Sequence, residues 1–128
     1  MGSDAHTCRV VVCDDVDAYR SLISMLLGFE DGVSVVGEAA NGQEAIDVAD
    51  REKPDVILLD VGMPVMDGIE ALPGIRAAAP DCRVIMLTGF SSDEVRRRAM
   101  AAGASDYVEK GASPDEIIRI VAGTCSPR

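Results

Sequence analysis

The sequence has no tryptophan, a single histidine (His6) and no long apolar run. Its uninterrupted apolar stretches, such as residues 56–59 and 84–87, are far shorter than the roughly 20 residues that cross a bilayer. The first residues, MGSDAHT, have neither a basic stretch nor an apolar core that would mark a secretory signal. We therefore expect no transmembrane segment, no membrane association and a cytoplasmic location.

Basic residues are also scarce, since 12 lysines and arginines stand against 22 aspartates and glutamates, a net charge of −10. This charge repels phosphate backbones and anionic lipids wherever screening is incomplete, which argues against direct nucleic-acid binding. The acidic residues could serve a divalent cation if several carboxylates converge, or could simply form a solvated surface. The positions of the acidic residues in the fold decide between a cation site and a solvated surface.

Cysteine is present at four positions, but in no metal-binding pattern. Cys8, Cys13, Cys82 and Cys125 include no C-x-x-C pair, and no histidine cluster accompanies them, so a zinc site is not expected. Cys8 and Cys13 are five residues apart, which on one strand directs their side chains to opposite faces and argues against a bridge between them. The expectation is reduced, mostly buried thiols.

The 128 residues suffice for one domain, and a hydrophobic content of 48% supplies a core. Clusters of β-branched and aliphatic residues predict five strands, separated by segments of helical length and period. The clusters are residues 10–13, 33–36, 56–59, 84–87 and 107–108. Such alternation, with connections too long for hairpins, indicates an α/β fold with a parallel sheet.

The clusters at residues 10–13, 56–59 and 84–87 are apolar without alternation, as expected of strands buried on both faces. The second and fifth clusters are mixed with polar residues and should form the edges. These assignments predict a single doubly wound, flavodoxin-like sheet with strand order 2-1-3-4-5 and helices on both faces. The predicted domain spans residues 8–123, between a flexible segment at 1–7 and a tail at 124–128 that could begin a linker.

Helix-capping signals support this division. Asn41 with Glu44, and Ser113 with Pro114 and Glu116, are typical of helix N-termini. Pro73 falls inside the expected third helix, where proline removes a backbone donor at a cost of about 3 kcal/mol. We therefore predict a kink or a late start in that helix.

Five polar residues follow or end the predicted strands: Asp14, Asp15, Asp60, Thr88 and Lys110. Because the carboxyl ends of parallel strands share one edge, these residues should meet there, beside the point where strand order reverses. Three carboxylates so close together repel one another, and a hard divalent cation such as Mg²⁺ would relieve the conflict. With Lys110 and Thr88 nearby, the set suits phosphoryl transfer onto Asp60 as the nucleophile, giving an acyl phosphate.

Taken one at a time, each of these residues could be an ordinary cap, turn or surface residue. Their joint order, however, resembles the receiver domain of two-component response regulators. The resemblance rests on D-D at 14–15, L-L-D-V-G-M-P-V-M-D-G at 58–68, L-T-G at 87–89 and D-Y-V-E-K at 106–110. It covers residues 8–123, and the D-x-x-M-P-x-M-D-G pattern is much more specific than a single short motif.

The resemblance implies a signalling switch, not an enzyme acting on a separate substrate, that takes a phosphoryl group from a phosphohistidine on a sensor histidine kinase. Asp60 would be the acceptor, and Lys110 would contact the phosphoryl group. For Mg²⁺, the resemblance implies direct binding by Asp15 and Asp60, binding through water by Asp14, and binding through the backbone carbonyl of Gly62.

The resemblance also implies how the signal leaves the site. Thr88 would move toward the phosphorylated aspartate and Tyr107 would swing inward, which remodels the surface formed by the fourth helix, fifth strand and fifth helix. Such a surface can support a phosphorylation-dependent homodimer or act on an effector domain. The segments V-V-G-E-A-A-N-G at 35–42 and K-G-A-S at 110–113 are similar to those in the receivers of LuxR-type transcription regulators. The helix-turn-helix domain of those regulators is not part of this sequence.

Two departures from the family pattern stand out. Many receivers have proline after the conserved lysine, whereas this chain has Gly111. Gly62 and Phe90, two residues after Asp60 and Thr88, occupy positions that in the family influence how fast the acyl phosphate hydrolyses. A bulky Phe90 that shields phosphorus from water would give slow self-dephosphorylation, and Phe90→Ala would then hydrolyse faster.

Rival functions fit less well. A haloacid-dehalogenase-type phosphatase needs a second aspartate two residues after the nucleophile, where this chain has Gly62. A dinucleotide or flavin binder needs a first strand–helix turn that cradles phosphate, and the Asp14–Asp15 pair would repel it. A binding module that has the receiver fold but signals without phosphorylation stays open as the alternative.

Overall fold

A computed structural model describes residues 7–89 and 92–125, in which five strands alternate with five helices. The strands are β1 (Cys8–Cys13), β2 (Val33–Ala39), β3 (Val56–Asp60), β4 (Arg83–Thr88) and β5 (Asp106–Glu109). The helices are α1 (Asp17–Gly28), α2 (Gly42–Glu52), α3 (Gly68–Ala78), α4 (Asp93–Ala101) and α5 (Pro114–Cys125). Each predicted strand is present and extends beyond its apolar cluster.

The strands form one parallel sheet in the order β2-β1-β3-β4-β5. This order confirms the predicted fold class, with β2 and β5 as the edges. Every residue of β3 is buried, whereas β2 is mostly half-buried and the residues of β5 are half-buried or exposed, in agreement with the difference in their sequences. A shift of register between Val10 and Val11 is the one irregularity in the pairing of β1 with β2.

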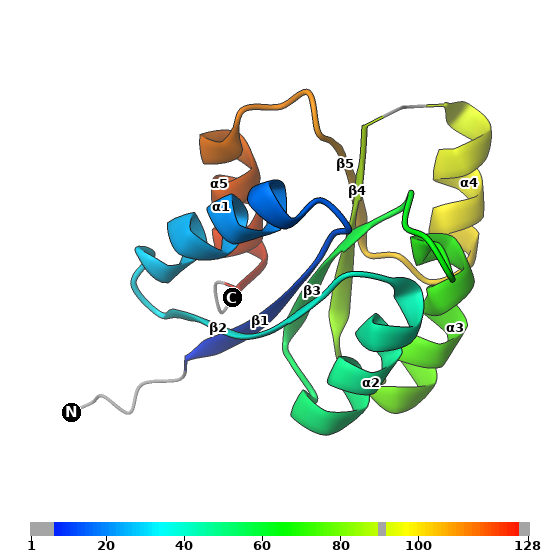
Figure 1. Cartoon of the computed structure of the whole chain (residues 1–128), viewed down its shortest axis with the longest axis horizontal. Coiled ribbons are helices and arrows are strands. Elements are labelled where there is room, and N and C mark those ends of the chain that lie inside the picture. Colours follow the sequence, from blue (N-terminus) through cyan, green and yellow to red (C-terminus); the bar gives the residue numbers. More distant parts are fainter. Residues whose placement is uncertain (1–6, 90–91, 126–128) are drawn as a thin grey trace.

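Helices cover both faces of the sheet (Figure 1). Helices α1 and α5 lie on one face, and α2, α3 and α4 lie on the other. Because successive side chains of a strand point to opposite faces, β1 contributes Val10 and Val12 to the core under α1 and α5, and Val11 to the core under α2 and α3. The two cores hold the strands rigidly, so that their carboxyl ends form a fixed platform.

The predicted helix caps at Asn41 and Ser113 are confirmed, because their side chains accept hydrogen bonds from the backbone N–H groups of Glu44 and Glu116. The predicted late start of α3 is wrong. Asp67 and Glu70 form a capping box, which begins the helix at Gly68, and the helix continues past Pro73 to Ala78. A bend at Pro73 stays a prediction.

The expectation of reduced thiols is wrong for two of the four cysteines. Cys8 and Cys125 form a disulfide with a Cα–Cα distance of 5.6 Å, and Cys13 and Cys82 are buried and free. The reason lies in the topology: α5 packs back across the sheet, so its last residue returns to the beginning of β1. Helix α5 therefore includes Thr124 and Cys125, which the sequence analysis assigns to a tail.

None of the helices in the described ranges combines the length and the apolar character that crossing a membrane requires.

Candidate functional site

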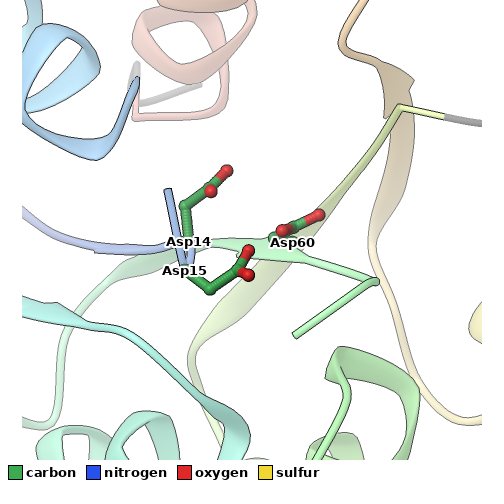
Figure 2. A group of neighbouring side chains, drawn as sticks. All are labelled: Asp14, Asp15 and Asp60. Atoms are coloured by element: carbon green, nitrogen blue, oxygen red, sulfur yellow. The ribbon is translucent and has the colours of Figure 1, made fainter. Parts of the chain in front are cut away.

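Three carboxylates converge at the carboxyl edge of the sheet, on neighbouring strands (Figure 2). Asp14 and Asp15 follow β1, and Asp60 ends β3. One carboxylate oxygen of each residue lies within 4.8 Å of the others. Asp14 and Asp60 are almost fully buried, at 1% and 4% exposure, whereas Asp15 is exposed. The cluster therefore has two buried acids and one that faces solvent.

Lys110 brings the compensating charge. It follows β5, and its backbone N–H donates to the carbonyl of Thr88 at 2.7 Å, which ties the lysine to the end of β4. Its Nζ lies 2.7 Å from Oδ2 of Asp14 and 3.4 Å from Oδ2 of Asp60. Burial alone would lower the pKa of Lys110, but the hydrogen bonds to both carboxylates and their charge outweigh it and raise the pKa. The lysine is thus held as a cation between two acids.

The charged form of Asp60, unlike that of Lys110, is destabilised, because one ammonium cannot neutralise two buried carboxylates. Burial, followed by repulsion from Asp14, raises the pKa of Asp60 to about 6, although Lys110 and the backbone N–H of Gly62 act against the rise. Asp60 is consequently ionised at neutral pH but carries its charge at a cost. A cation or an electrophile at this position would relieve that cost.

The loop after Asp60 is fixed by backbone hydrogen bonds. The N–H of Val61 donates to the carbonyl of Leu87 at 2.9 Å, and the N–H of Gly68 donates to the carbonyl of Val61 at 2.9 Å. The N–H of Gly62 points back to Oδ1 of Asp60 at 3.3 Å. Gly62 itself is exposed, and a Cβ there would meet no heavy atom within 4 Å.

Thr88 and Tyr107 lie on β4 and β5, the two strands that follow β3 across the sheet. Thr88 is buried at 4% exposure and ends β4, the strand next to β3. Tyr107 on β5 packs against the core, and its hydroxyl is buried without a hydrogen-bond partner among the described residues. The guanidinium of Arg96 on α4 lies 5.9 Å from the centre of the Tyr107 ring. The tyrosine therefore joins the fourth helix to the strand that leads to Lys110.

Gly111 and Phe90 are the two remaining positions for which the sequence analysis states an expectation. Gly111 lies in a turn that the N–H of Ala112 closes on the carbonyl of Glu109 at 3.1 Å, so the chain turns here without the proline that many receivers have. Phe90, the expected shield of the acyl phosphate, lies outside the described residues.

Tyr19 is a site residue that the sequence analysis does not identify. It lies in the first turn of α1, and its ring centre is 4.8 Å from Nζ of Lys110. Burial is the largest cause of its raised pKa, and the neighbouring charges of Lys110, Asp14 and Asp60 act on it as well. Residue spacing gives no signal for this contact, because Asp15 and Asp14 lie before the first residue of α1 and the helical i,i+4 rule does not relate them to Tyr19.

The donor set fits a hard divalent cation. The carboxylate oxygens of Asp14, Asp15 and Asp60 are ligands of the kind that Mg²⁺ prefers, and the set contains no sulfur or imidazole. The raised pKa of Asp60 shows that one ammonium leaves negative charge uncompensated here. The residues present are thus suited to Mg²⁺, and the cluster could hold it without rearranging the sheet.

Comparison with known proteins connects this geometry to one family. The family model described as "Response regulator receiver domain" matches residues 10–122. The solved receiver domain of the response regulator NarL from Mycobacterium tuberculosis has a TM-score of 0.89 and 31% identity, with 97% of this chain and all of that chain covered.

Two curated relatives differ in what they do beyond the shared region. The uncharacterized transcriptional regulatory protein YhcZ of Bacillus subtilis is 38% identical over 87% of this chain and 52% of its own length. A protein-glutamate methylesterase/protein-glutamine glutaminase of Rhodospirillum centenum is 40% identical over 91% of this chain and 29% of its own length. The chain thus spans about half or less of these relatives, and what it shares with them is one signalling domain.

Proposed function

Because the chain belongs to the response regulator receiver family, we propose that its acidic edge accepts a phosphoryl group on Asp60 in a Mg²⁺-dependent reaction. The observation that carries this proposal is the Asp60 carboxylate itself. It ends the central strand β3, is buried beside Asp14, and lies 3.4 Å from Nζ of Lys110. With a pKa of about 6, it is an ionised nucleophile at neutral pH and needs no base to deprotonate it.

In the proposed reaction, a carboxylate oxygen of Asp60 forms a bond to phosphorus while the bond from phosphorus to the donor breaks. A phosphohistidine of a sensor histidine kinase would be the donor in the cell, and its imidazole nitrogen would leave with the electron pair. The product is an acyl phosphate on Asp60. Lys110, whose Nζ is already 3.4 Å from Asp60, would direct its remaining N–H groups at the phosphoryl oxygens.

Asp14, Asp15 and Asp60, with the backbone carbonyl of Gly62, would hold the Mg²⁺ ion. When bound, Mg²⁺ neutralises carboxylate and phosphoryl charge and so removes the repulsion that opposes attack by one anion on another. Arg20 supports this end of the site, because its guanidinium donates to the backbone carbonyl of Asp14 at 2.6 Å and pairs with Glu38 on β2.

We further propose that Thr88 and Tyr107 carry the signal to the surface formed by α4, β5 and α5. Thr88 is at the end of the strand beside Asp60, and Tyr107 contacts Arg96 of α4. A change in the charge on Asp60 would shift the balance between two arrangements of these side chains. The output would be an attached effector domain, a partner protein or a second copy of the domain, in the cytoplasm. The description of YhcZ as a transcriptional regulatory protein favours regulation of transcription.

The test is the intact mass of the protein after incubation with acetyl phosphate, with Mg²⁺ and with EDTA. We expect one added phosphoryl group on the wild-type protein with Mg²⁺, and none with EDTA or on Asp60→Asn. Asp81→Asn is the matched control, since it makes the same chemical change at an exposed position before β4, at the opposite edge of the sheet. This control should phosphorylate like the wild type.

An Asp60→Asn protein that still gains the phosphoryl group would contradict the assignment of the acceptor. Absence of any adduct on the wild type, together with absence of Mg²⁺ binding, would contradict phosphotransfer and favour the receiver-fold binding module that signals without phosphorylation.

A further inference from the structure

We propose that Tyr19 is a positioning residue of this site, whose aromatic face holds the Lys110 ammonium in place above the Asp14 and Asp60 carboxylates; the role rests on the proposed phosphoacceptor function. The Lys110 Nζ lies 4.8 Å from the ring centre, 2.7 Å from Asp14 and 3.4 Å from Asp60. The ammonium is therefore bounded by two carboxylates and by the negative face of an aromatic ring, within the distance at which a cation and a ring attract each other.

The ring supplies a form of attraction that the carboxylates cannot. A lysine side chain has a flexible four-carbon stem and a compact charge, so two nearby acids alone leave its head group free to follow whichever acid is more negative. The structure already shows an unequal pairing, with Asp14 closer to Nζ than Asp60 by 0.7 Å, the difference between 3.4 and 2.7 Å. A neutral ring at a fixed place would keep the ammonium near Asp60 when the charge on either acid changes.

A ring also leaves the hydrogen-bonding capacity of the lysine available. An ammonium has three N–H donors, and attraction to an aromatic face does not require any of them to be given to a strong acceptor. Lys110 could therefore be held by Tyr19 while its donors turn to the oxygens of an incoming phosphoryl group. An additional carboxylate at the position of Tyr19 would instead compete with those oxygens.

The contact is between a cation and a neutral ring. Burial raises the pKa of the Tyr19 phenol, so the phenol stays protonated at neutral pH and cannot form an ion pair with Lys110. The hydroxyl is buried and has no hydrogen-bond partner among the described residues, so no hydrogen bond orients the ring. Packing orients it instead, because Tyr19 adjoins the core formed by β1, α1 and α5.

The same observations give a graded set of variants. Tyr19→Phe keeps the ring and removes an unpaired hydroxyl, so it should keep Lys110 in place. Tyr19→Leu keeps an apolar side chain against the core but removes the aromatic face. Comparison of the two variants separates the ring from its packing, since a merely structural role would be served by either side chain.

The first measurement is NMR of the lysine side chains in metal-free protein labelled with ¹³C at the lysine ε-carbon. The chain has two lysines, and Lys53 pairs with Asp50 and the carbonyl of Ala78 far along the sequence from Tyr19, so it is an internal reference. The ring current should move the ε-protons of Lys110 upfield of those of Lys53 in wild type and Tyr19→Phe. In Tyr19→Leu the upfield shift should disappear while the Lys53 signal stays unchanged.

The second measurement is the rate of phosphorylation by acetyl phosphate with saturating Mg²⁺. We expect Tyr19→Leu to be about five- to tenfold slower than the wild type, the range expected for loss of a partly desolvated cation–ring contact, and Tyr19→Phe to be within about twofold of the wild type. Thermal melting of each variant in the same buffer shows that the comparison is made on folded protein.

Two results would overturn the inference: a Lys110 signal in the wild type with no upfield shift, or a Tyr19→Leu protein that phosphorylates as fast as the wild type. Failure of the proposed function looks different. In that case no variant gains a phosphoryl group, although the Lys110 signal still responds to Tyr19→Leu, and Tyr19 would then have no phosphoryl-transfer site to position.

Discussion

Asp60 places a carboxyl group in the interior beside the carboxyl group of Asp14, with one ammonium between them. Each buried charge loses its hydration, and the two like charges repel. The raised pKa of Asp60 is the measure of that penalty. The residue that we propose as the phosphoryl acceptor therefore destabilises the fold of the metal-free protein.

The penalty predicts an unusual dependence of stability on pH. The pKa of Asp60 is about 6 in the folded protein, compared with about 3.9 for an unperturbed aspartate. Between these values the folded protein binds a proton that the unfolded chain has lost, so Asp60 makes stability fall as pH rises from about 4 to about 6. Asp60→Asn should therefore raise the free energy of unfolding by about 2 kcal/mol at pH 7.5 and by almost nothing at pH 4.

Urea denaturation of both proteins in EDTA at several pH values measures this difference. Asp81→Asn, which alters an exposed carboxylate, should leave the profile of the wild type unchanged. A constant difference between Asp60→Asn and wild type at all pH values would contradict the role of the buried charge.

At the residue scale, the sequence located the polar residues of the site because topology decides where strand ends meet. Asp14, Asp60 and Lys110 each follow or end a strand, and a parallel sheet brings those positions to one edge whatever the details of packing. Tyr19 could not be found in the same way. Its contact with Lys110 depends on how α1 is rotated against the sheet, which the packing of both helices on that face determines.

Helix α3 shows how elements override local preference. Pro73 has no N–H to donate to the preceding turn, yet the helix continues, because the capping box at Asp67 and the burial of Ile69, Leu72 and Ile75 favour it. Proline in this setting lowers helix propensity without ending the helix. The sequence predicted the helix with a kink or a late start, and of these two alternatives the late start is wrong, since the strength of tertiary burial cannot be read from one local residue.

Two glycines in helices give a matched prediction at this scale. A Cβ at Gly68 would lie 2.3 Å from the backbone carbonyl oxygen of Asp60, whereas a Cβ at Gly123 in α5 would meet no heavy atom within 4 Å. Gly68→Ala should lower the free energy of unfolding by about 1–3 kcal/mol, because backbone must move to admit the methyl group. Gly123→Ala should raise it by about 0.5–1 kcal/mol, because alanine loses less conformational entropy in a helix.

Denaturant unfolding of both variants and the wild type measures these differences in the free energy of unfolding. Equal effects of the two substitutions, in either direction, would show that the close approach of α3 to the end of β3 is not what requires glycine at position 68. Gly68→Ala should also slow the proposed phosphorylation, since the displaced carbonyl belongs to Asp60, the proposed acceptor.

At the scale of the whole molecule, the Cys8–Cys125 disulfide closes nearly the entire domain into a loop, since the two cysteines are 117 positions apart in the sequence. Closing so long a loop restricts the unfolded chain and stabilises the fold by about 2–5 kcal/mol. Disulfides are rare in a reducing cytoplasm, where we propose that the domain acts, so the bridged and open forms both matter.

Thermal melting with and without a thiol reductant measures that contribution. The reductant should lower the melting temperature of the wild type, whereas a Cys8→Ala/Cys125→Ala protein should melt at the same temperature in both buffers. Cys13 and Cys82 are buried and free, so they should add no reductant-dependent effect. Identical melting of the wild type in both buffers would contradict the stabilising role of the bridge.

The pairing of Cys8 with Cys125 could not be predicted from the sequence, for a physical reason. The strand order, the cover of helices on both faces and the edge that carries the site all follow from patterns repeated along the chain. Proximity of two residues 117 positions apart depends on the length and direction of the last helix relative to the first strand. Single cysteines at two distant positions carry no periodic signal of that proximity.

The same bridge decides how the domain would bear mechanical tension. A force that pulls on the chain before Cys8 and after Cys125 would pass through one covalent bond, and the sheet between them would carry none of it. Once the bridge is reduced, the force falls on β1 and α5, and unfolding would release about 3.3–3.6 Å of contour length for each of the 117 residues, roughly 400 Å in all. The redox state of Cys8 and Cys125 thus determines whether the domain keeps its length under tension or unfolds and extends.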